Sequence, residues 1–296
     1  MINNVISVPV HEKAEVVIDQ IVNYNFFCPE CGIVLHISNG FNWKDSLLKE
    51  EDFLSILSTF ENVFVNPTRL NTAYADIVHT HISNFEYISK VVEFEYFSLG
   101  SSNDLFVRHM PEISDGESCS SLGSTLERVS SYLSFYKKII ADEYLNKILE
   151  HFGVTQSYVR KGQIEGSFYS KDIFQKIVDI INKVYSYEEV WNKNRLIYPR
   201  EEVYYNTIAN ILNKDKSLKI TQPNFTRIFW EMKGILPTIQ QITEIAEGKI
   251  AKKYAVKRVL RNIDDPARVY IGTQIGNYRE QTLNLIHSKT KENEHD

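Results

Sequence analysis

The stretch EYFSLGSSNDLFVRHM at residues 95–110 decides the expected fold, because a strand-like apolar run meets a polar cluster there. Its apolar part, FEYFSLG at 94–100, has the composition of a buried β-strand, and the Ser-Ser-Asn-Asp sequence that follows ends on one acid, Asp104. In an open α/β sheet the ligand crevice lies beyond the carboxyl ends of the strands, so a polar ligand would bind at such a place. The other interpretation is a strand followed by an Asn/Asp helix cap.

Three more strand-like segments precede this one, and helical patterns separate all four. The strand-like segments are NVISVPV, GIVLHIS and NVFVNP, at residues 4–10, 32–38 and 62–67. Apolar residues at helical spacing occupy residues 11–24, 46–60 and 71–91, and an Asn/Thr cap opens the last of these segments. This alternation predicts an α/β fold with a mostly parallel, right-handed β-α-β sheet flanked by helices. The polar strand ends HISN, NPTR and SSND would then share one edge.

The rest of the chain is rich in helical patterns. Residues 111–125 contain many Ser, Gly and acidic residues and are typical of a loop. Helical segments follow at 126–153, and residues 162–185 indicate a strand or turn that leads into a helix. Residues 198–212, YPREEVYYNTIANIL, predict another helix with two glutamates in its first turn. We find no Gly-rich phosphate loop of the Walker kind and no internal repeat.

The charge of the chain is divided unevenly between its two halves. Residues 1–150 carry 10 Lys and Arg against 21 Asp and Glu, whereas residues 151–296 carry 23 against 17. A basic carboxyl-terminal half favours an anionic ligand there, although solvated faces produce the same asymmetry. The overall net charge of −5 argues against a nucleic-acid partner.

Three cysteines and the amino-terminal segment bear on the cellular environment. Cys28 and Cys31 form a Cys-x-x-Cys motif, but neither a second pair nor a His-x-x-x-His follows, so with Cys119 they predict reduced structural thiols rather than a zinc site. No apolar run approaches the length of a membrane span, and residues 1–17 lack the pattern of a signal peptide. We therefore expect a cytoplasmic protein, with membrane contact only at the surface.

The order of the motifs resembles a known family of sugar-transferring enzymes. Residues 8–39 have a strand, a His-containing turn, a helix and a strand ending in LHIS, where an IHVD-like end is typical, so Ser38 replaces an acid. FEYFSLGSSNDLFVR resembles an LSGxDxPL loop, EGSFYSKDIF a GSxW segment and PREEVYYNTIA a PDExxxxT segment. Residues 227–259 resemble an IxW motif followed by a FARKF box. Together these motifs resemble the core-2/I-branching β-1,6-N-acetylglucosaminyltransferase family, and more closely its soluble bacterial relatives.

The resemblance implies a Rossmann-like GT-A glycosyltransferase fold with a helix-rich carboxyl-terminal half. It implies one domain at 1–285, with a nucleotide-binding half at 1–125, an acceptor- and diphosphate-binding half at 126–285 and a polar tail at 286–296. The implied reaction is inverting transfer of a sugar from a nucleotide-diphosphate donor, with UDP favoured, to a glycan hydroxyl. It needs neither metal nor cofactor. A lipid-linked glycan of a bacterial surface polysaccharide is the implied acceptor.

Two glutamates are candidates for the base that deprotonates the acceptor. By the resemblance, counting back from Thr207 selects Glu202, which we favour, whereas counting forward from Pro199 selects Glu201. Either position is also explained by the helix dipole, which stabilises acidic residues in a first turn by roughly 0.3–1 kcal/mol. A base at a helix N-terminus would need burial to raise its pKa toward neutrality.

The remaining candidate residues would hold the donor and the acceptor. The departing diphosphate needs cations, because a lone Asp104 cannot supply the oxygen ligands that Mg²⁺ prefers. Lys257 aligns with the lysine of the FARKF box, and Arg258 can bond phosphate in a bidentate way; a solvated basic face is the alternative. The residues expected at the donor are Lys257, Arg258, Arg261, His11, Ser38, Arg69, Ser102 and Asp104, and those expected at the acceptor are Glu165, Phe168 and Tyr169.

Two other classes of protein compete with this hypothesis. A non-catalytic sugar-nucleotide or glycan-binding module is favoured if neither glutamate faces the crevice. A metal-dependent nucleotidyltransferase usually has two acids at strand ends, and the absence of an Asp-x-Asp after the fourth strand counts against that class.

Overall fold

A computed structural model describes residues 1–72, 77–114, 116–119, 121–126, 133–184, 186–193, 198–221, 224–229 and 236–290. Its centre is a sheet with the strand order β3-β2-β1-β4-β8. The strands are β1 (Ile2–Val10), β2 (Cys31–Ile37), β3 (Val63–Val65), β4 (Phe94–Leu99) and β8 (Ser167–Ser170). The first four run parallel, and β8 pairs antiparallel with β4. The chain is thus a mixed α/β protein compatible with a Rossmann-like fold.

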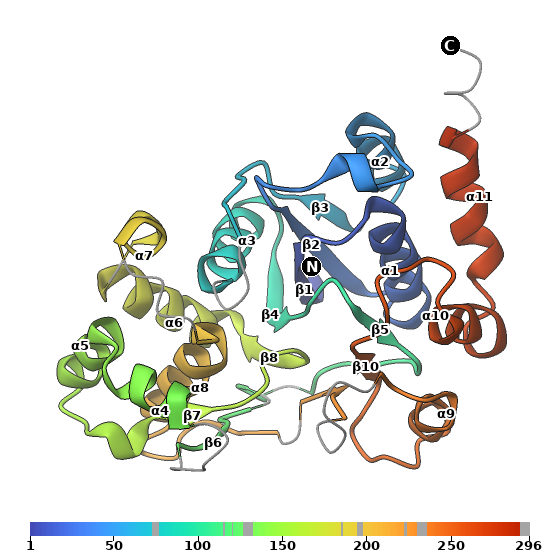
Figure 1. Cartoon of the computed structure of the whole chain (residues 1–296). Coiled ribbons are helices and arrows are strands. Elements are labelled where there is room, and N and C mark those ends of the chain that lie inside the picture. The colour runs from blue at the N-terminus through green and yellow to red at the C-terminus, as the bar shows by residue number, and fades with distance from the viewer. Residues whose placement is uncertain are drawn as a thin grey trace.

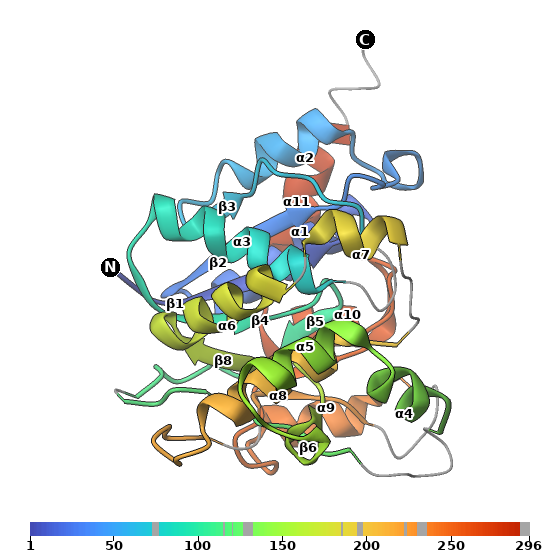
Figure 2. The same cartoon turned by 90° about the vertical axis from the view of Figure 1, so that its left-hand side faces the viewer.

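Helices cover both faces of this sheet (Figures 1 and 2). On one face lie α1 (Ala14–Phe27) and α2 (Glu50–Leu57); α11 (Arg279–Thr290) packs against α1, and α9 (Ile239–Ala246) packs against α10 (Pro266–Tyr270). On the other face α3 (Val78–Val91) and α6 (Lys171–Val184) contact the strands, α5 (Glu143–His151) and α8 (Arg200–Leu212) pack against α6, and α4 (Leu133–Ile140) packs against α5. The helix α7 (Tyr187–Lys193) precedes α8, and a π-helical turn (Ile271–Ile275) follows α10. No helix within these described ranges is both long and apolar enough to cross a membrane.

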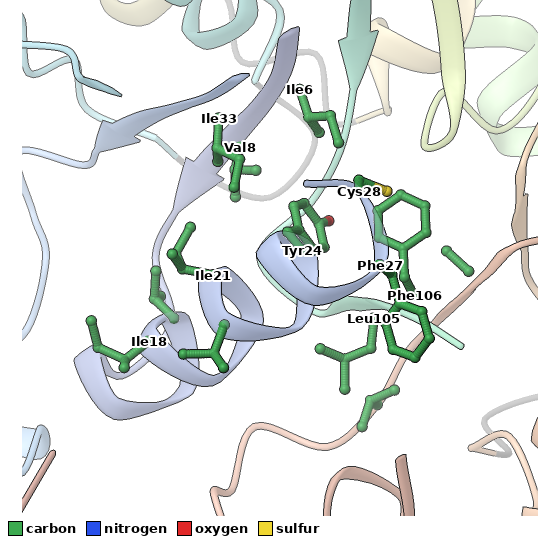
Figure 3. Packing of buried hydrophobic residues seen from close by; sticks show 14 of the residues in the cluster. Ile6, Val8, Ile18, Ile21, Tyr24, Phe27, Cys28, Ile33, Leu105 and Phe106 are labelled. Atoms are coloured by element: carbon green, nitrogen blue, oxygen red, sulfur yellow. The ribbon is translucent and has the colours of Figure 1, made fainter. Parts of the chain in front are cut away.

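Alternation along β1 divides its side chains between two hydrophobic clusters. Ile6, Val8 and Val10 belong to the cluster under α1, whereas Val5 belongs to the cluster under α3. Figure 3 shows the first cluster, in which Tyr24 of α1 lies among strand and loop side chains. Burial on both faces explains why the predicted strands appear as nearly continuous apolar runs.

A smaller sheet extends the carboxyl edge of the central one. It has the order β5-β10-β9, from β5 (Asp104–Phe106), β10 (Ala255–Lys257) and β9 (Thr226–Arg227). The register of the antiparallel β5·β10 pair sets Lys257 opposite Asp104. Ser-Ser-Asn-Asp therefore turns into a short strand, and the helix cap that the sequence left open does not form.

Some boundaries differ from those expected from the sequence. The helix expected from residue 71 begins at Val78, and the Thr72 hydroxyl donates instead to the Ser38 hydroxyl at 2.8 Å. Within the expected loop at 111–125, the short strand β6 (Ser124–Thr125) pairs antiparallel with β7 (Arg160–Lys161). The helix α11 continues to Thr290 with Ile286 buried, so the segment expected as a polar tail begins inside a helix, and residues 291–296 lie outside the described ranges.

Gly166 offers a test of how tightly the two sheets join. Its φ is +77°, and a Cβ there would lie 2.3 Å from the Thr226 backbone nitrogen. We expect Gly166→Ala to destabilise the protein by about 3 kcal/mol or more, because left-handed strain adds to a backbone clash. Gly153→Ala is the matched control, since Gly153 has φ +59° but nothing within 4 Å of the added Cβ. Equal losses for both variants in urea denaturation would contradict the clash.

Candidate functional site

A cavity of about 680 Å³ opens beyond the carboxyl end of β1 and the turn after β4. This volume lies in the ordinary range for small-molecule sites. One part of its lining is polar and comes from strand ends, loops and the first turn of α8 (Arg200–Leu212). It comprises His11, Thr72, Ser101, Asn103, Lys161, Glu165, Glu201, Glu202, Lys257, Arg258 and Arg261. The cavity thus occupies the edge at which the polar strand ends were expected to meet.

The Lys and Arg residues of the described lining all come from the carboxyl-terminal half of the chain: Lys161, Lys257, Arg258 and Arg261. The Lys257 ammonium forms an ion pair with the Glu165 carboxylate. Burial lowers the pKa of Lys257, but the carboxylates of Glu165, Asp104 and Glu202 outweigh burial, so the net shift is upward. Lys257 is therefore a permanent positive charge in the wall of the cavity.

Asp104 lies opposite Lys257 in the β5·β10 pairing, and its carboxylate favours the charged form of Lys257. Its carboxylate accepts hydrogen bonds from the Ser101 hydroxyl at 2.8 Å and the Ser101 backbone N–H at 3.2 Å. Burial raises the pKa of Asp104 to about 7, although Lys257 beside it acts in the opposite direction. Asp104 is 2% exposed, so it acts through Lys257 and the Ser101 turn rather than as part of the cavity surface.

Glu201 and Glu202 both line the cavity from the first turn of α8. Burial raises the pKa of Glu202 to about 7, with Glu165 acting in the same direction and Lys257 in the opposite one. Burial raises the pKa of Glu201 to about 8. Glu201 is 8% exposed, and its Oε2 has no hydrogen-bond partner among the described residues. Burial thus raises these two pKa values by more than the helix dipole lowers them, as a base at this position requires.

A buried polar cluster fixes this end of α8. The Asp142 carboxylate caps α5 by accepting from the backbone N–H of Tyr144 and Leu145 at 3.0 and 3.2 Å. It also accepts from the hydroxyls of Tyr198 and Tyr204 and from the Arg200 guanidinium, whose side chain is 1% exposed. Because Arg200 directly precedes the two glutamates, Asp142 ties their position to α5.

Two arginines follow Lys257 along the rim. Arg258 lines the cavity with a φ of +69°, a left-handed conformation that costs a non-glycine residue free energy and recurs at functional sites. Arg261 is 61% exposed, and its Nε lies 2.8 Å from Oε1 of the buried Glu12. Ser102 donates to the same Glu12 oxygen at 3.4 Å.

Six residues expected at the site lie outside the described cavity lining, and the buried Asp104 is one of them. Ser38 is buried and accepts a hydrogen bond from Thr72, which lines the cavity, and Ser102 is buried beside Glu12. Arg69 is exposed and pairs with Glu50 at the start of α2, away from the lining. Phe168 and Tyr169 point into the two hydrophobic clusters on opposite faces of the sheet, because neighbouring residues of β8 alternate. Aromatic side chains of that strand pack the core instead of meeting a ligand.

The sequence analysis did not predict several of the residues that line the cavity. Lys161, Phe135 and Ile139 carry no local motif and reach the cavity only through the tertiary fold. Asp142 does carry a signal, since Asp-Glu before an apolar run predicts a helix cap. Its partners Tyr198, Arg200 and Tyr204 follow 56 to 62 residues later in the sequence, and no sequence pattern predicts these contacts.

The cysteines lie apart from this cavity. Cys28, Cys31 and Cys119 are free thiols, and Cys28 belongs to the cluster under α1 (Figure 3). Within the described part of the chain, no group of three or more His, Cys, Asp and Glu side chains is arranged to hold a metal ion.

A second hollow, of about 470 Å³, lies at the opposite end of the sheet near Met1, Asn3 and Glu95. Its described lining contains two acidic side chains and no Lys, Arg or His. An anionic ligand therefore suits the first cavity and not this one.

No protein-family model matches this chain, and the comparison with curated proteins finds no match either.

Buried Glu201 predicts a specific pH dependence of stability. Its folded pKa of about 8 lies above the ordinary 4.5, so the folded state retains the proton and loses stability as pH rises through this window. Glu201→Gln removes this titration. We therefore expect the free energy of unfolding of the variant, relative to that of the original protein, to be higher at pH 8.5 than at pH 5 by on the order of 4 kcal/mol. Urea denaturation at both pH values measures this change.

The exposed Glu188 of α7 provides the control, because Glu188→Gln changes no buried group. A difference between Glu201→Gln and the original protein that stays constant with pH would contradict a buried, protonated Glu201.

Proposed function

We propose that this protein is an inverting glycosyltransferase of GT-A architecture that moves a sugar from a nucleotide-diphosphate donor, UDP-linked by preference, to a glycan hydroxyl. The observation that carries the proposal is one cavity lined both by Glu202 and by the cations Lys257, Arg258 and Arg261. Transfer by single displacement needs a base for the acceptor hydroxyl and positive charge for the departing diphosphate. The mostly parallel sheet with its cavity at the carboxyl edge is compatible with this architecture.

Glu202 is the proposed base. In the reaction the acceptor hydroxyl gives its proton to the Glu202 carboxylate while its oxygen bonds to the anomeric carbon of the donor sugar. The bond from that carbon to the diphosphate oxygen breaks, and its electron pair leaves with the nucleoside diphosphate. A pKa of about 7 suits this role, because a base with a pKa near the working pH is present as carboxylate and still binds a proton well.

Lys257 and Arg258 are proposed to neutralise the leaving group. Lys257 is held in place by Glu165 and Asp104, so its charge needs no rearrangement as the diphosphate departs. Arg258 adds a planar guanidinium that can bond two phosphate oxygens. In the proposed mechanism these cations take the role that a divalent metal ion has in metal-dependent enzymes. Activity in the presence of a chelator tests this metal independence.

The two rival classes fit this site less well. We expected a non-catalytic module if neither glutamate faced the crevice, and both line the cavity. A metal-dependent nucleotidyltransferase needs paired acids at strand ends, whereas the Asp104 carboxylate is engaged by Ser101 and neighbours Lys257.

Glu202→Gln should lower sugar transfer by about a hundredfold or more while leaving donor affinity within about twofold, because it removes the base and keeps the shape. Activity of the original protein should rise as pH passes about 7, where the Glu202 carboxylate forms. Nucleotide release from UDP-, GDP-, CMP- and dTDP-sugars with glycan acceptors is the measurement. Glu201→Gln is the paired variant; if it loses the activity and Glu202→Gln does not, the base is Glu201.

Lys257→Met should weaken UDP binding by roughly tenfold to a hundredfold, because a charged hydrogen bond to phosphate is lost. Calorimetric titration with UDP in EDTA measures the effect. Lys249→Met is the control, since Lys249 pairs with Glu247 on the surface, outside the cavity lining. Transfer activity that EDTA abolishes and Mn²⁺ restores would overturn the metal-independent mechanism.

A further inference from the structure

The cavity has a second wall that the proposed chemistry does not use. Six apolar or aromatic residues form it: Ile77, Phe135, Ile139, Tyr198, Val203 and Ile228. They come from the residue before α3, from α4, from the first turn of α8 and the segment just before it, and from the segment after β9. This wall, here called the apolar wall, shares the cavity with Glu201 and Glu202, which flank it on α8.

The apolar wall is part of the molecular framework. Ile139, Tyr198 and Val203 belong to the hydrophobic cluster under α3, and Ile77 and Phe135 pack against the same cluster while remaining half-buried. Phe135 and Ile139 are one helical turn apart, so a single face of α4 supplies both. The Tyr198 hydroxyl is bound by Asp142, which fixes this residue at the cavity.

The cations and the apolar residues of α4 reach the cavity from different elements. The described lining residues of α4 are apolar, whereas the cations lie on β7, at the end of β10 and in the loop after it. A sugar hydroxyl or a phosphate gains nothing from apolar side chains, but an apolar group does, because its transfer from water is favourable in proportion to the area covered. A group that covers the apolar wall therefore presents apolar surface to it, and the same molecule can reach the carboxylates of Glu201 and Glu202.

We propose that the acceptor carries an apolar aglycone next to its reacting sugar, and that the apolar wall binds this group. The inference rests on the proposed function, since the hydroxyl beside Glu202 is the acceptor's. It goes further by placing the apolar group inside the catalytic cavity rather than in a remote part of a lipid-linked glycan. Phe135 and Ile77 are the residues that determine this preference.

Calorimetric titration of the full-length protein with alkyl glycosides tests the proposal without any donor. The probes are methyl, butyl and octyl glycosides of glucose, galactose and N-acetylglucosamine, each below the concentration at which it forms micelles. We expect affinity to rise roughly threefold to fourfold per added methylene until the wall is covered. Phenyl glycosides in parallel distinguish an aromatic aglycone from an alkyl chain.

Two variants locate the effect. Phe135→Ala and Ile77→Ala should each reduce the gain from butyl to octyl by about tenfold, while binding of UDP and of methyl glycosides stays unchanged. Phe152→Ala is the matched control, because Phe152 is half-buried against the same cluster but does not line the cavity. Circular dichroism and denaturation curves establish that each variant is folded.

The outcomes separate this inference from the proposed function. Affinity that does not rise with chain length for any sugar, or a rise that both wall variants leave intact, would overturn the apolar subsite. Tight, Phe135-dependent binding of long glycosides without turnover of any nucleotide sugar would retain the subsite and contradict glycosyl transfer.

Discussion

The antiparallel pairing of β10 with β5 is the constraint on which the site depends. It sets Lys257 opposite Asp104, and these residues lie more than 150 positions apart in the sequence. A buried ammonium is costly unless carboxylates surround it, and here Glu165 and Asp104 neutralise it. Glu165 stands directly before Gly166, whose left-handed backbone fits against Thr226. The position of the Lys257 ammonium therefore depends on how the central sheet and the smaller sheet pack against each other.

The same packing acts on the glutamates of α8. A helix N-terminus favours ionised acids, yet burial raises the pKa of both Glu201 and Glu202. The Asp142 cluster holds Arg200, and therefore the first turn of α8, against α5. Raised carboxyl pKa values in a cavity are typical of acid and base chemistry. The apolar residues that α4 contributes to the lining add a second, independent property to this cavity.

Much of the amino-terminal half followed from the sequence. Its four parallel strands were expected near residues 4–10, 32–38, 62–67 and 94–100, and the structure places strands in all four segments. The helix at 198–212 was also expected, with its two glutamates in the first turn. β8 was recognised only as a strand or turn, because four residues with aromatic content do not specify which sheet edge they join.

What the sequence by itself determined is the set of local elements and the polar residues at strand ends, because periodicity, caps and proline act over a few residues. It also placed the positive charge in the carboxyl-terminal half, from which the Lys and Arg residues of the cavity lining come. Only the tertiary structure decided that Phe168 and Tyr169 pack the core, that Arg69 pairs with Glu50, and that α4 lines the cavity. Those outcomes depend on contacts between residues distant in the chain, and burial, which sets both packing and pKa, exists only after such contacts form.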